Sequence, residues 1–256
     1  MKKISVIIIT KNEEENIFAC LESIKWADEI ILVDSGSTDK TVEIAKRFTD
    51  RIYINEWRGF AKQKEYALSL TLNEWVLSID ADERVSDELK IEIENIDTED
   101  VDGYYILRDN YFLGKKITSC GWNNDYQLRL FNKKKTKVNQ RLVHEGFDVD
   151  SNTKKMKNPI LHFTHTSLEK SIEKINHYTT LEAIEIKNKR KVGSIRILLR
   201  GFSAFFRFYI SKKGFKDGFA GFSISMLNAF TSIQTNMKVW ELKQKEKMKV
   251  NEEKNY

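Results

Sequence analysis

The sequence predicts an α/β protein with a doubly wound, mostly parallel sheet, a mixed extension of that sheet and a helical C-terminal region. Three observations predict it. Between residues 4 and 96, short apolar runs alternate with segments of helical period, an order typical of parallel sheets. Residues 103–165 contain strand-like runs without helices between them, and the chain after residue 167 is mostly helical in pattern. The predicted domains are residues 1–165 and 166–256.

The first strand is predicted for residues 4–9, a run rich in β-branched residues that is typical of a strand covered on both faces. A helix over about 13–25 follows, because Ile17, Leu21 and Ile24 recur at helical spacing. Strands and helices then alternate, and Ser86 is expected to cap the last helix. The predicted ranges are strand 29–34, helix 40–48, strand 51–54, helix 60–70, strand 75–79 and helix 86–96.

The second half is predicted to extend the sheet and then to become helical. Strand-like runs lie at 103–108, 126–131 and 160–163. Residues 194–210 place three arginines within about 40° on a helical wheel, beside many apolar residues, which is typical of a basic amphipathic helix on an anionic membrane. The three are Arg196, Arg200 and Arg207. The alternative is that these apolar residues pack against the domain of residues 1–165.

Charge is divided unevenly along the 256 residues. The net charge of +5 combines 14 Lys+Arg against 25 Asp+Glu in residues 1–110 with 29 against 13 in residues 111–256. The basic half is expected to meet an anionic membrane or a phosphorylated substrate, and no nucleic-acid motif is recognised. Cys20 and Cys120 make no disulfide framework, and the N-terminus lacks a signal-peptide pattern, so we expect a cytoplasmic protein.

Polar residues gather where the predicted parallel strands end, the edge at which such sheets bind ligands. They follow the first, second and fourth strands: Thr10, Asn12 and Glu13; Asp34; and Asp80 with Asp82. This edge has no glycine-rich phosphate loop, so a divalent cation held by carboxylates would supply the positive charge for phosphates. Asp34 precedes any cap position, so we expect its carboxylate to be free for a base or ribose. The alternatives are a capping turn at 34–39 and a solvated turn at 80–83.

These motifs, in this order, resemble the inverting glycosyltransferases of family 2, which have the GT-A nucleotide-sugar fold. The segments that carry the resemblance are 5–13, 34–39 and 80–83. Four later segments resemble the subgroup that contains bacterial lipopolysaccharide core β-glucosyltransferases. They are 110–115, 121–125, 128–131 and 143–145.

The resemblance implies a role for each matching residue. Thr10 and Asp34 would contact the uridine, and Asp80 the ribose or the metal side of the nucleotide. Asn12 and Glu13 are assigned to the same nucleotide site. Asp82 would bind the Mn²⁺ or Mg²⁺ ion, and His144 would complete the metal shell unless it is a core histidine. Asp125 occupies the position of the catalytic base, and Glu145 and Asp109 are the alternative bases.

The expected function is metal-dependent, inverting transfer of a hexose from a UDP-hexose, most simply UDP-glucose. The expected acceptor is an inner-core sugar of lipopolysaccharide or lipooligosaccharide, reached from the inner face of the cytoplasmic membrane. One alternative is the same chemistry on a polyprenyl-linked or capsule acceptor. Another is a non-catalytic, membrane-associated binding module on the same fold.

Overall fold

The computed structural model describes the backbone of residues 2–139 and 146–254, and their side chains except those of His165 and residues 249–254. Its contacts divide the chain into two compact units. The first combines Met1–Tyr111 with Asn124–Thr164, and the second combines Phe112–Asn123 with His165–Tyr256. The grouping of Phe112–Asn123 with the C-terminal helices was not anticipated, and the boundary expected after residue 165 stays a prediction.

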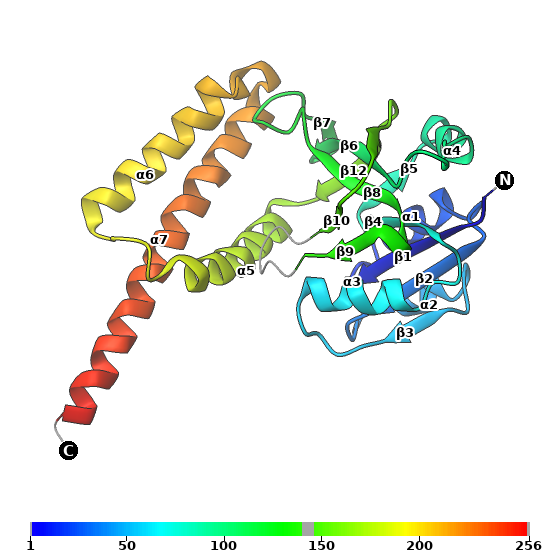
Figure 1. Ribbon diagram of the computed structural model, residues 1–256. Coiled ribbons are helices and arrows are strands. Elements are labelled where there is room, and N and C mark those ends of the chain that lie inside the picture. Colours follow the sequence, from blue (N-terminus) through cyan, green and yellow to red (C-terminus); the bar gives the residue numbers. More distant parts are fainter. Residues whose placement is uncertain (1, 140–145, 255–256) are drawn as a thin grey trace. The chain divides into compact units, whose positions relative to one another are not determined.

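The first unit is built on the predicted mostly parallel sheet, which the structure confirms (Figure 1). Four parallel strands lie side by side: β3 (Ile52–Ile54), β2 (Glu29–Asp34), β1 (Ile4–Thr10) and β4 (Trp75–Asp80). The sheet then continues as a mixed extension. Its strands are, in order, β8 (Tyr126–Asn132), β6 (Gly103–Phe112), β12 (Ile160–His165) and β5 (Glu83–Val85). Because β8 runs antiparallel to β4, the parallel part of the sheet ends there.

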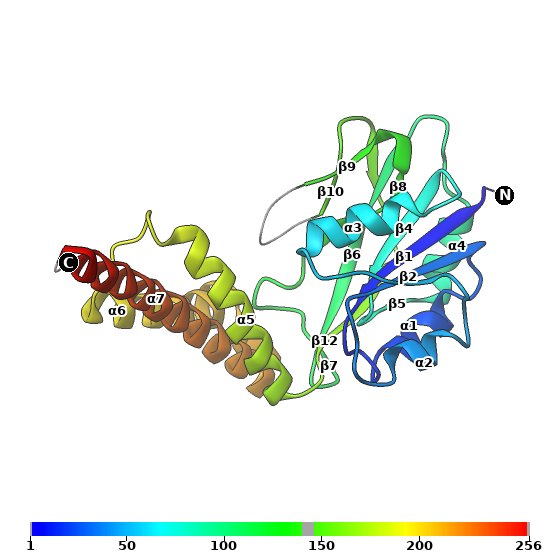
Figure 2. The same ribbon diagram turned by 90° about the horizontal axis from the view of Figure 1, so that it is seen from below.

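Helices cover both faces of the parallel strands, which explains their continuous apolar runs. The helices are α1 (Ile17–Ser23), α2 (Thr41–Ala45), α3 (Phe60–Ser69) and α4 (Asp87–Glu94). Figure 2 shows α3 on one face of β1 and β2, and α1 and α2 on the other. The helices are shorter than predicted, but the Ser86 cap is confirmed, since its Oγ accepts a hydrogen bond from the Leu89 N–H at 3.2 Å.

Several short strands were not predicted. They are β5, β7 (Lys115–Lys116), β9 (Thr136–Val138), β10 (Phe147–Val149) and β11 (Thr153–Lys155). Each has two or three residues, at least one of them charged, so neither an apolar run nor an alternating pattern marks it. β5 matters most for the site, because its first residue, Glu83, is fully buried.

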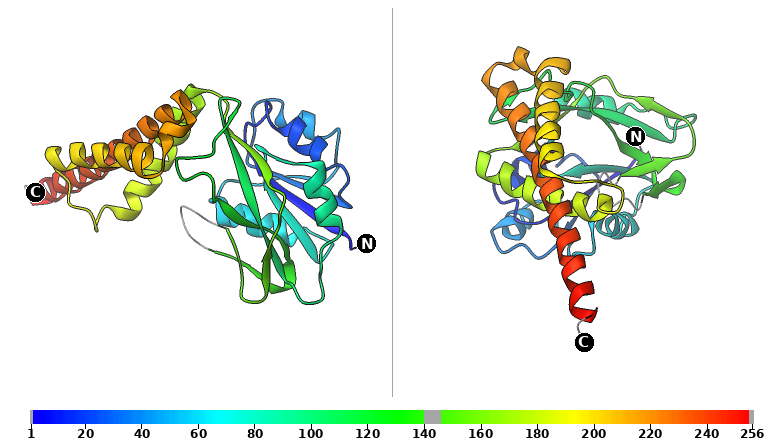
Figure 3. Two further views of the ribbon diagram at one scale, coloured as in Figure 1. Left: turned by 90° about the horizontal axis from the view of Figure 1, so that it is seen from above. Right: turned by 90° about the vertical axis from the view of Figure 1, so that its left-hand side faces the viewer.

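The second unit contains the predicted C-terminal helices: α5 (Leu168–Ile186), α6 (Ser194–Phe206) and α7 (Phe219–Lys254). Figure 3 shows α6 lying alongside α7. The Asp217 carboxylate fastens Phe112–Asn123 to the turn before α7, accepting from the N–H groups of Thr118 at 3.0 Å and Ser119 at 2.9 Å. Among the described residues, no helix is both long enough and apolar enough to cross a membrane.

Candidate functional site

The strand register brings the ends of β1, β2 and β4 together. Thr10 pairs with Asp34 across β1 and β2, and Ile9 pairs with Asp80 across β1 and β4. The loop after β1 is then tied to the loop after β2, because the Asn12 N–H donates to Ser37 Oγ at 2.8 Å. The predicted nucleotide-site residues therefore come from neighbouring strand ends, as expected for an open parallel sheet.

Asp34 is fully buried, and its carboxylate serves its own turn. It accepts hydrogen bonds from the Gly36 N–H at 2.9 Å, the Ser37 N–H at 2.8 Å and the Ser37 hydroxyl at 2.5 Å. The expectation that this carboxylate is free of hydrogen bonds within the protein is therefore wrong. A buried Asp side chain readily accepts hydrogen bonds from the N–H and hydroxyl groups of the turn that follows it. Its contact with uridine stays a prediction.

Thr10 and Glu13 differ in whether their side chains have hydrogen-bond partners within the protein. The Thr10 hydroxyl is buried and has no hydrogen-bond partner among the described residues. Such a group is costly to bury unless a ligand or water completes it. The Glu13 carboxylate instead accepts from Asn16 Nδ2 at 2.9 Å, and its N–H donates to Thr41 Oγ1 at 2.8 Å. Glu13 thus organises the start of α1, and its role toward a nucleotide stays a prediction.

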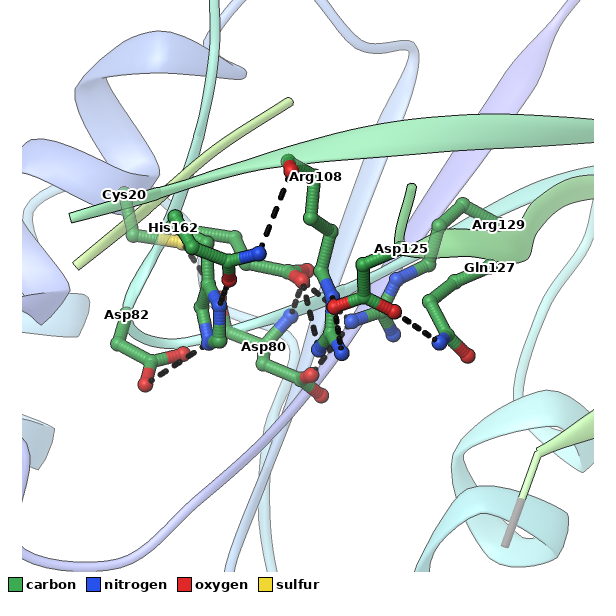
Figure 4. Close-up of polar contacts among 10 residues, drawn as sticks. Cys20, Asp80, Asp82, Arg108, Asp125, Gln127, Arg129 and His162 are labelled. Atoms are coloured by element: carbon green, nitrogen blue, oxygen red, sulfur yellow. Dashed lines mark hydrogen bonds and ion pairs between the residues drawn. The ribbon is translucent and has the colours of Figure 1, made fainter. Parts of the chain in front are cut away.

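A chain of alternating charges links Asp80 to Asp125 (Figure 4). Arg129 donates to the Asp80 carboxylate at 2.6 Å and also pairs with Glu83. Glu83 accepts from the Asp80 N–H at 2.9 Å and lies 3.8 Å from Arg108 Nη1. Arg108 in turn holds Asp125, with Nε at 2.8 Å and Nη2 at 2.5 Å from the same oxygen. Five side chains from β4, β5, β6 and β8 and the loop before β8 thus form one ionic network.

The network sets the charge of its carboxyl groups. Burial works against ionisation of Asp80, but the positive charges of Arg129 and Lys64 outweigh it and hold the pKa of Asp80 well below its usual range. Burial, with the neighbouring Asp80 charge, raises the pKa of Glu83. Glu83 is thus the buried carboxyl group that connects the two arginines, and Asp80 is the carboxylate that is ionised at the strand edge.

Asp125 is held in position by hydrogen bonds from neighbouring side chains, chiefly those of Arg108 and Gln127. Besides the two bonds from Arg108, Gln127 Nε2 donates to its other carboxylate oxygen at 2.7 Å. Burial acts to raise the pKa of Asp125, but the Arg108 charge and these hydrogen bonds prevail, so the pKa lies below its usual value. Asp125 is therefore ionised at neutral pH, the state in which a carboxylate can accept a proton from a hydroxyl group.

Asp82 meets a histidine that the sequence analysis did not single out. His162 Nε2 lies 3.4 Å from Asp82 Oδ2, and His162 Nδ1 lies 2.6 Å from Asn110 Oδ1. Asn110 Nδ2 donates to the Arg108 carbonyl at 3.3 Å, which sets the amide orientation and makes Oδ1 the acceptor. In the neutral ring, Nδ1 therefore carries the hydrogen, and Nε2 turns its lone pair toward Asp82.

This donor set fits a divalent cation. An imidazole nitrogen and a carboxylate oxygen face each other at 3.4 Å, and the other ring nitrogen is bonded to an amide oxygen, as is usual for metal-binding histidines. Within the part of the chain that the structure describes, no group of three His, Cys, Asp or Glu side chains forms a complete ligand set. Two protein ligands suffice where substrate phosphates and water supply the others. His144 and Glu145 lie outside the described residues.

Four important residues were missed by the sequence analysis: Glu83, Arg108, Arg129 and His162. A signal was present for two of them. Arg129 lies between Leu128 and Leu130 in a strand-like run, and His162 interrupts the apolar run of β12. A charged or polar residue at an inward strand position has to find a partner. The partner could not be read from the sequence, because Arg129 and Asp80 are 49 residues apart.

Comparison with known proteins adds independent information. The profile of the family described as Glycosyl transferase family 2 matches residues 5–156. An uncharacterized glycosyltransferase of Rickettsia typhi is 32% identical over 257 residues, covering 94% of this chain and 88% of the relative. The lipopolysaccharide core biosynthesis glycosyltransferase LpsC of Rhizobium meliloti is 29% identical over 248 residues, covering 93% of this chain and 92% of LpsC.

Among solved structures, glucosyl-3-phosphoglycerate synthase from Mycobacterium tuberculosis, in complex with Mn²⁺, UDP and glucosyl-3-phosphoglycerate, matches with a TM-score of 0.48. The identity is 17%, and the match covers 72% of this chain and 79% of that one. The family profile spans most of the first structural unit, and the sequence relatives span both units. Together with the confirmed sheet, this agreement shows that the chain belongs to glycosyl transferase family 2.

Proposed function

We propose that this glycosyltransferase is a metal-dependent, inverting hexosyltransferase that uses a UDP-hexose, with UDP-glucose as the first donor to test. The observation that carries the proposal is the ionic network from Asp80 to Asp125. It connects an ionised carboxylate of the proposed nucleotide edge to an ionised candidate base through two arginines and Glu83. A single displacement needs one such base.

The protein residues have distinct tasks in this proposal. Asp125 accepts the proton of the attacking acceptor hydroxyl while Arg108 and Gln127 hold its carboxylate in place. Attack from the face opposite the leaving nucleotide inverts the anomeric carbon. Thr10 and Asp34 orient the uridine, and Asp80 orients the ribose side. Asp82 and His162 would hold Mn²⁺ or Mg²⁺, which supplies positive charge to the departing diphosphate.

The proposed acceptor is an inner-core sugar of lipopolysaccharide or lipooligosaccharide. It is supported by the relative LpsC, which is named for lipopolysaccharide core biosynthesis, and by the net charge of +16 that the counts give for residues 111–256. A polyprenyl-linked or capsule acceptor is the alternative. The proposed location is the cytoplasm, with the protein attached peripherally to the inner face of the cytoplasmic membrane.

A nucleotide-release assay tests the proposal. The protein is incubated with Mn²⁺ or Mg²⁺, a panel of nucleotide sugars and truncated lipopolysaccharide, and the released nucleoside diphosphate is measured. The double variant Asp80→Asn/Asp82→Asn should lose metal-dependent transfer. The matched control is Asp148→Asn/Asp150→Asn, which changes a triplet of the same spacing at two exposed positions. Full activity of the first variant would contradict the metal assignment, and binding without turnover of any donor would indicate a binding module.

A further inference from the structure

Helix α6 has three distinct faces. Its most exposed large apolar side chains cover about 100° of the helix at 100° per residue. They are Ile195, Leu198, Leu199, Phe202 and Phe206. A second face carries Arg196 and Arg200, and Arg207 continues it in the helical turn that follows, Arg207–Ser211. The third packs on α7, where a Cβ atom added to Gly201 would come within 2.6 Å of Ile233. The apolar face is therefore not the face that α6 uses for packing.

Helix α7 carries a second exposed apolar stripe. Its members recur three, four or seven positions apart and cover about 80° of the helix. They are Phe219, Phe222, Met226, Phe230, Met237 and Trp240. Phe219 is 82% exposed, the highest value among the large apolar side chains of the described residues. At 1.5 Å per residue the stripe is about 30 Å long, far more than an isolated exposed side chain.

Ring contacts join the two stripes at the turn between the helices. Phe205 contacts Phe206 at a centroid distance of 5.6 Å and Phe222 at 5.8 Å. Phe222 contacts Phe219 at 6.1 Å, so the aromatic surface is continuous from α6 to the start of α7. We define these two stripes and the rings that join them as the α6/α7 apolar surface.

The charges within the segment that carries α6, the turn and the α7 stripe are almost all positive. Residues 187–240 contain 11 Lys and Arg and a single acidic residue, Asp217. Asp217 is buried, and its carboxylate is engaged by Thr118 and Ser119. Lys213 and Lys216 are exposed in the turn itself. The partner that fits is therefore both apolar and anionic.

We propose that the α6/α7 apolar surface lies on an anionic lipid bilayer, with Phe219 and the α6 stripe inserted among the acyl chains. Aromatic side chains favour the boundary between headgroups and acyl chains, and arginines beside them bind lipid phosphates. This extends the predicted membrane contact from residues 194–210 to α7. The inference does not depend on glycosyl transfer, because it uses only residues of the second unit.

A second copy of the chain is a poorer occupant. A symmetric dimer through this surface would place the same basic residues of both copies beside each other, and like charges destabilise such an interface. An anionic bilayer avoids this repulsion, since its lipid phosphates supply negative charge opposite the basic residues beside the apolar surface.

Vesicle flotation with the full chain tests the proposal. The vesicles contain phosphatidylcholine alone or phosphatidylcholine mixed with phosphatidylglycerol. Leu199→Ser/Phe202→Ser removes apolar area from exposed positions, and Leu72→Ser/Ile91→Ser is the control, because both of those residues are exposed in the first unit. Arg196→Glu/Arg207→Glu reverses two charges beside the stripe, and Lys46→Glu/Arg47→Glu is its control. Arg200 is left unchanged because it donates to Asn236 at 2.8 Å.

We expect the unaltered protein to bind the anionic vesicles and to bind the neutral ones weakly. Each of the two surface variants should lower the bound fraction by about tenfold, and the controls should not. The proposal is overturned if the unaltered protein does not bind anionic vesicles, or if both surface variants show the same bound fraction as the unaltered protein. It is also overturned if light scattering finds a dimer that Leu199→Ser/Phe202→Ser converts to a monomer while vesicle binding is unchanged.

Discussion

Arg108 holds Asp125 through two nitrogens that converge on one carboxylate oxygen, Nε at 2.8 Å and Nη2 at 2.5 Å. Gln127 Nε2 donates a hydrogen bond to the other carboxylate oxygen of Asp125 at 2.7 Å. The direction of the Asp125 carboxylate is therefore set by the protein before any acceptor sugar arrives. Such preorganisation is worth much in catalysis, because no reorganisation is needed during the reaction.

Replacing the candidate base should stop the reaction without abolishing nucleotide binding. Asp125→Asn keeps the size of the side chain but cannot take up a proton, so kcat should fall by about 10²- to 10⁴-fold. UDP affinity, measured by calorimetry, should change little. Asp109→Asn is the comparison, since Asp109 is an alternative base. A large loss in Asp109→Asn with near-normal turnover in Asp125→Asn would reverse the assignment.

Replacing Arg108 should change the pH dependence of transfer. The positive charge of Arg108 lowers the pKa of Asp125, so Arg108→Met should raise that pKa. The base is active when ionised, and activity is lost as the pH falls through its pKa. The acidic limb of the kcat/KM profile should therefore move to higher pH in Arg108→Met. Arg108→Lys, which keeps the charge, should shift it less. A limb that stays in place in Arg108→Met would show that Asp125 does not limit the reaction.

Metal binding should depend on His162 and, more weakly, on Asn110. Mn²⁺ affinity in the presence of UDP is measured by electron paramagnetic resonance, which does not require turnover. His162→Ala removes a proposed ligand and should lower Mn²⁺ affinity most. Asn110→Leu removes the hydrogen bond that orients the His162 ring, and loss of such a partner typically lowers metal affinity by about 10- to 100-fold. His177→Ala, at an exposed position on α5, is the control. Unchanged Mn²⁺ affinity in His162→Ala would show that His162 is not a metal ligand.

The first turn of α7 should not tolerate a side chain at Gly221, which packs against the turn before the helix. A Cβ atom there would lie 1.8 Å from the Gly214 carbonyl oxygen, which is backbone and cannot rotate away. We expect Gly221→Ala to lower the free energy of unfolding by about 3 kcal/mol or more, measured by denaturant titration. Gly193→Ala, with no atom within 4 Å of the added Cβ, should cost at most about 1 kcal/mol. Equal stability of the two variants would mean that the turn has room to adjust.

The order of the first elements was predictable because local pattern decides it. The buried strands of the parallel sheet are apolar runs, and β1, β2 and β4 agree with prediction to within a residue or two. The short strands β5, β9, β10 and β11 were missed because each contains a charged residue, so no apolar run marks it. The positions of Thr10, Asp34 and Asp80 at one edge followed from the same pattern, since parallel strands end together.

By itself, the sequence determined the parallel sheet, the sheet edge at which the candidate nucleotide-site residues gather and the amphipathic character of residues 194–210. Only the tertiary structure decided that Asp34 closes its own turn, that His162 faces Asp82, and that Arg108 and Arg129 join Asp125 to Asp80. It also decided which face of α6 packs on α7 and which stays exposed. The physical reason is that periodicity is a property of neighbouring residues. Ion pairs and helix packing join residues that are tens of positions apart, and the order of strands in the sheet selects those partners.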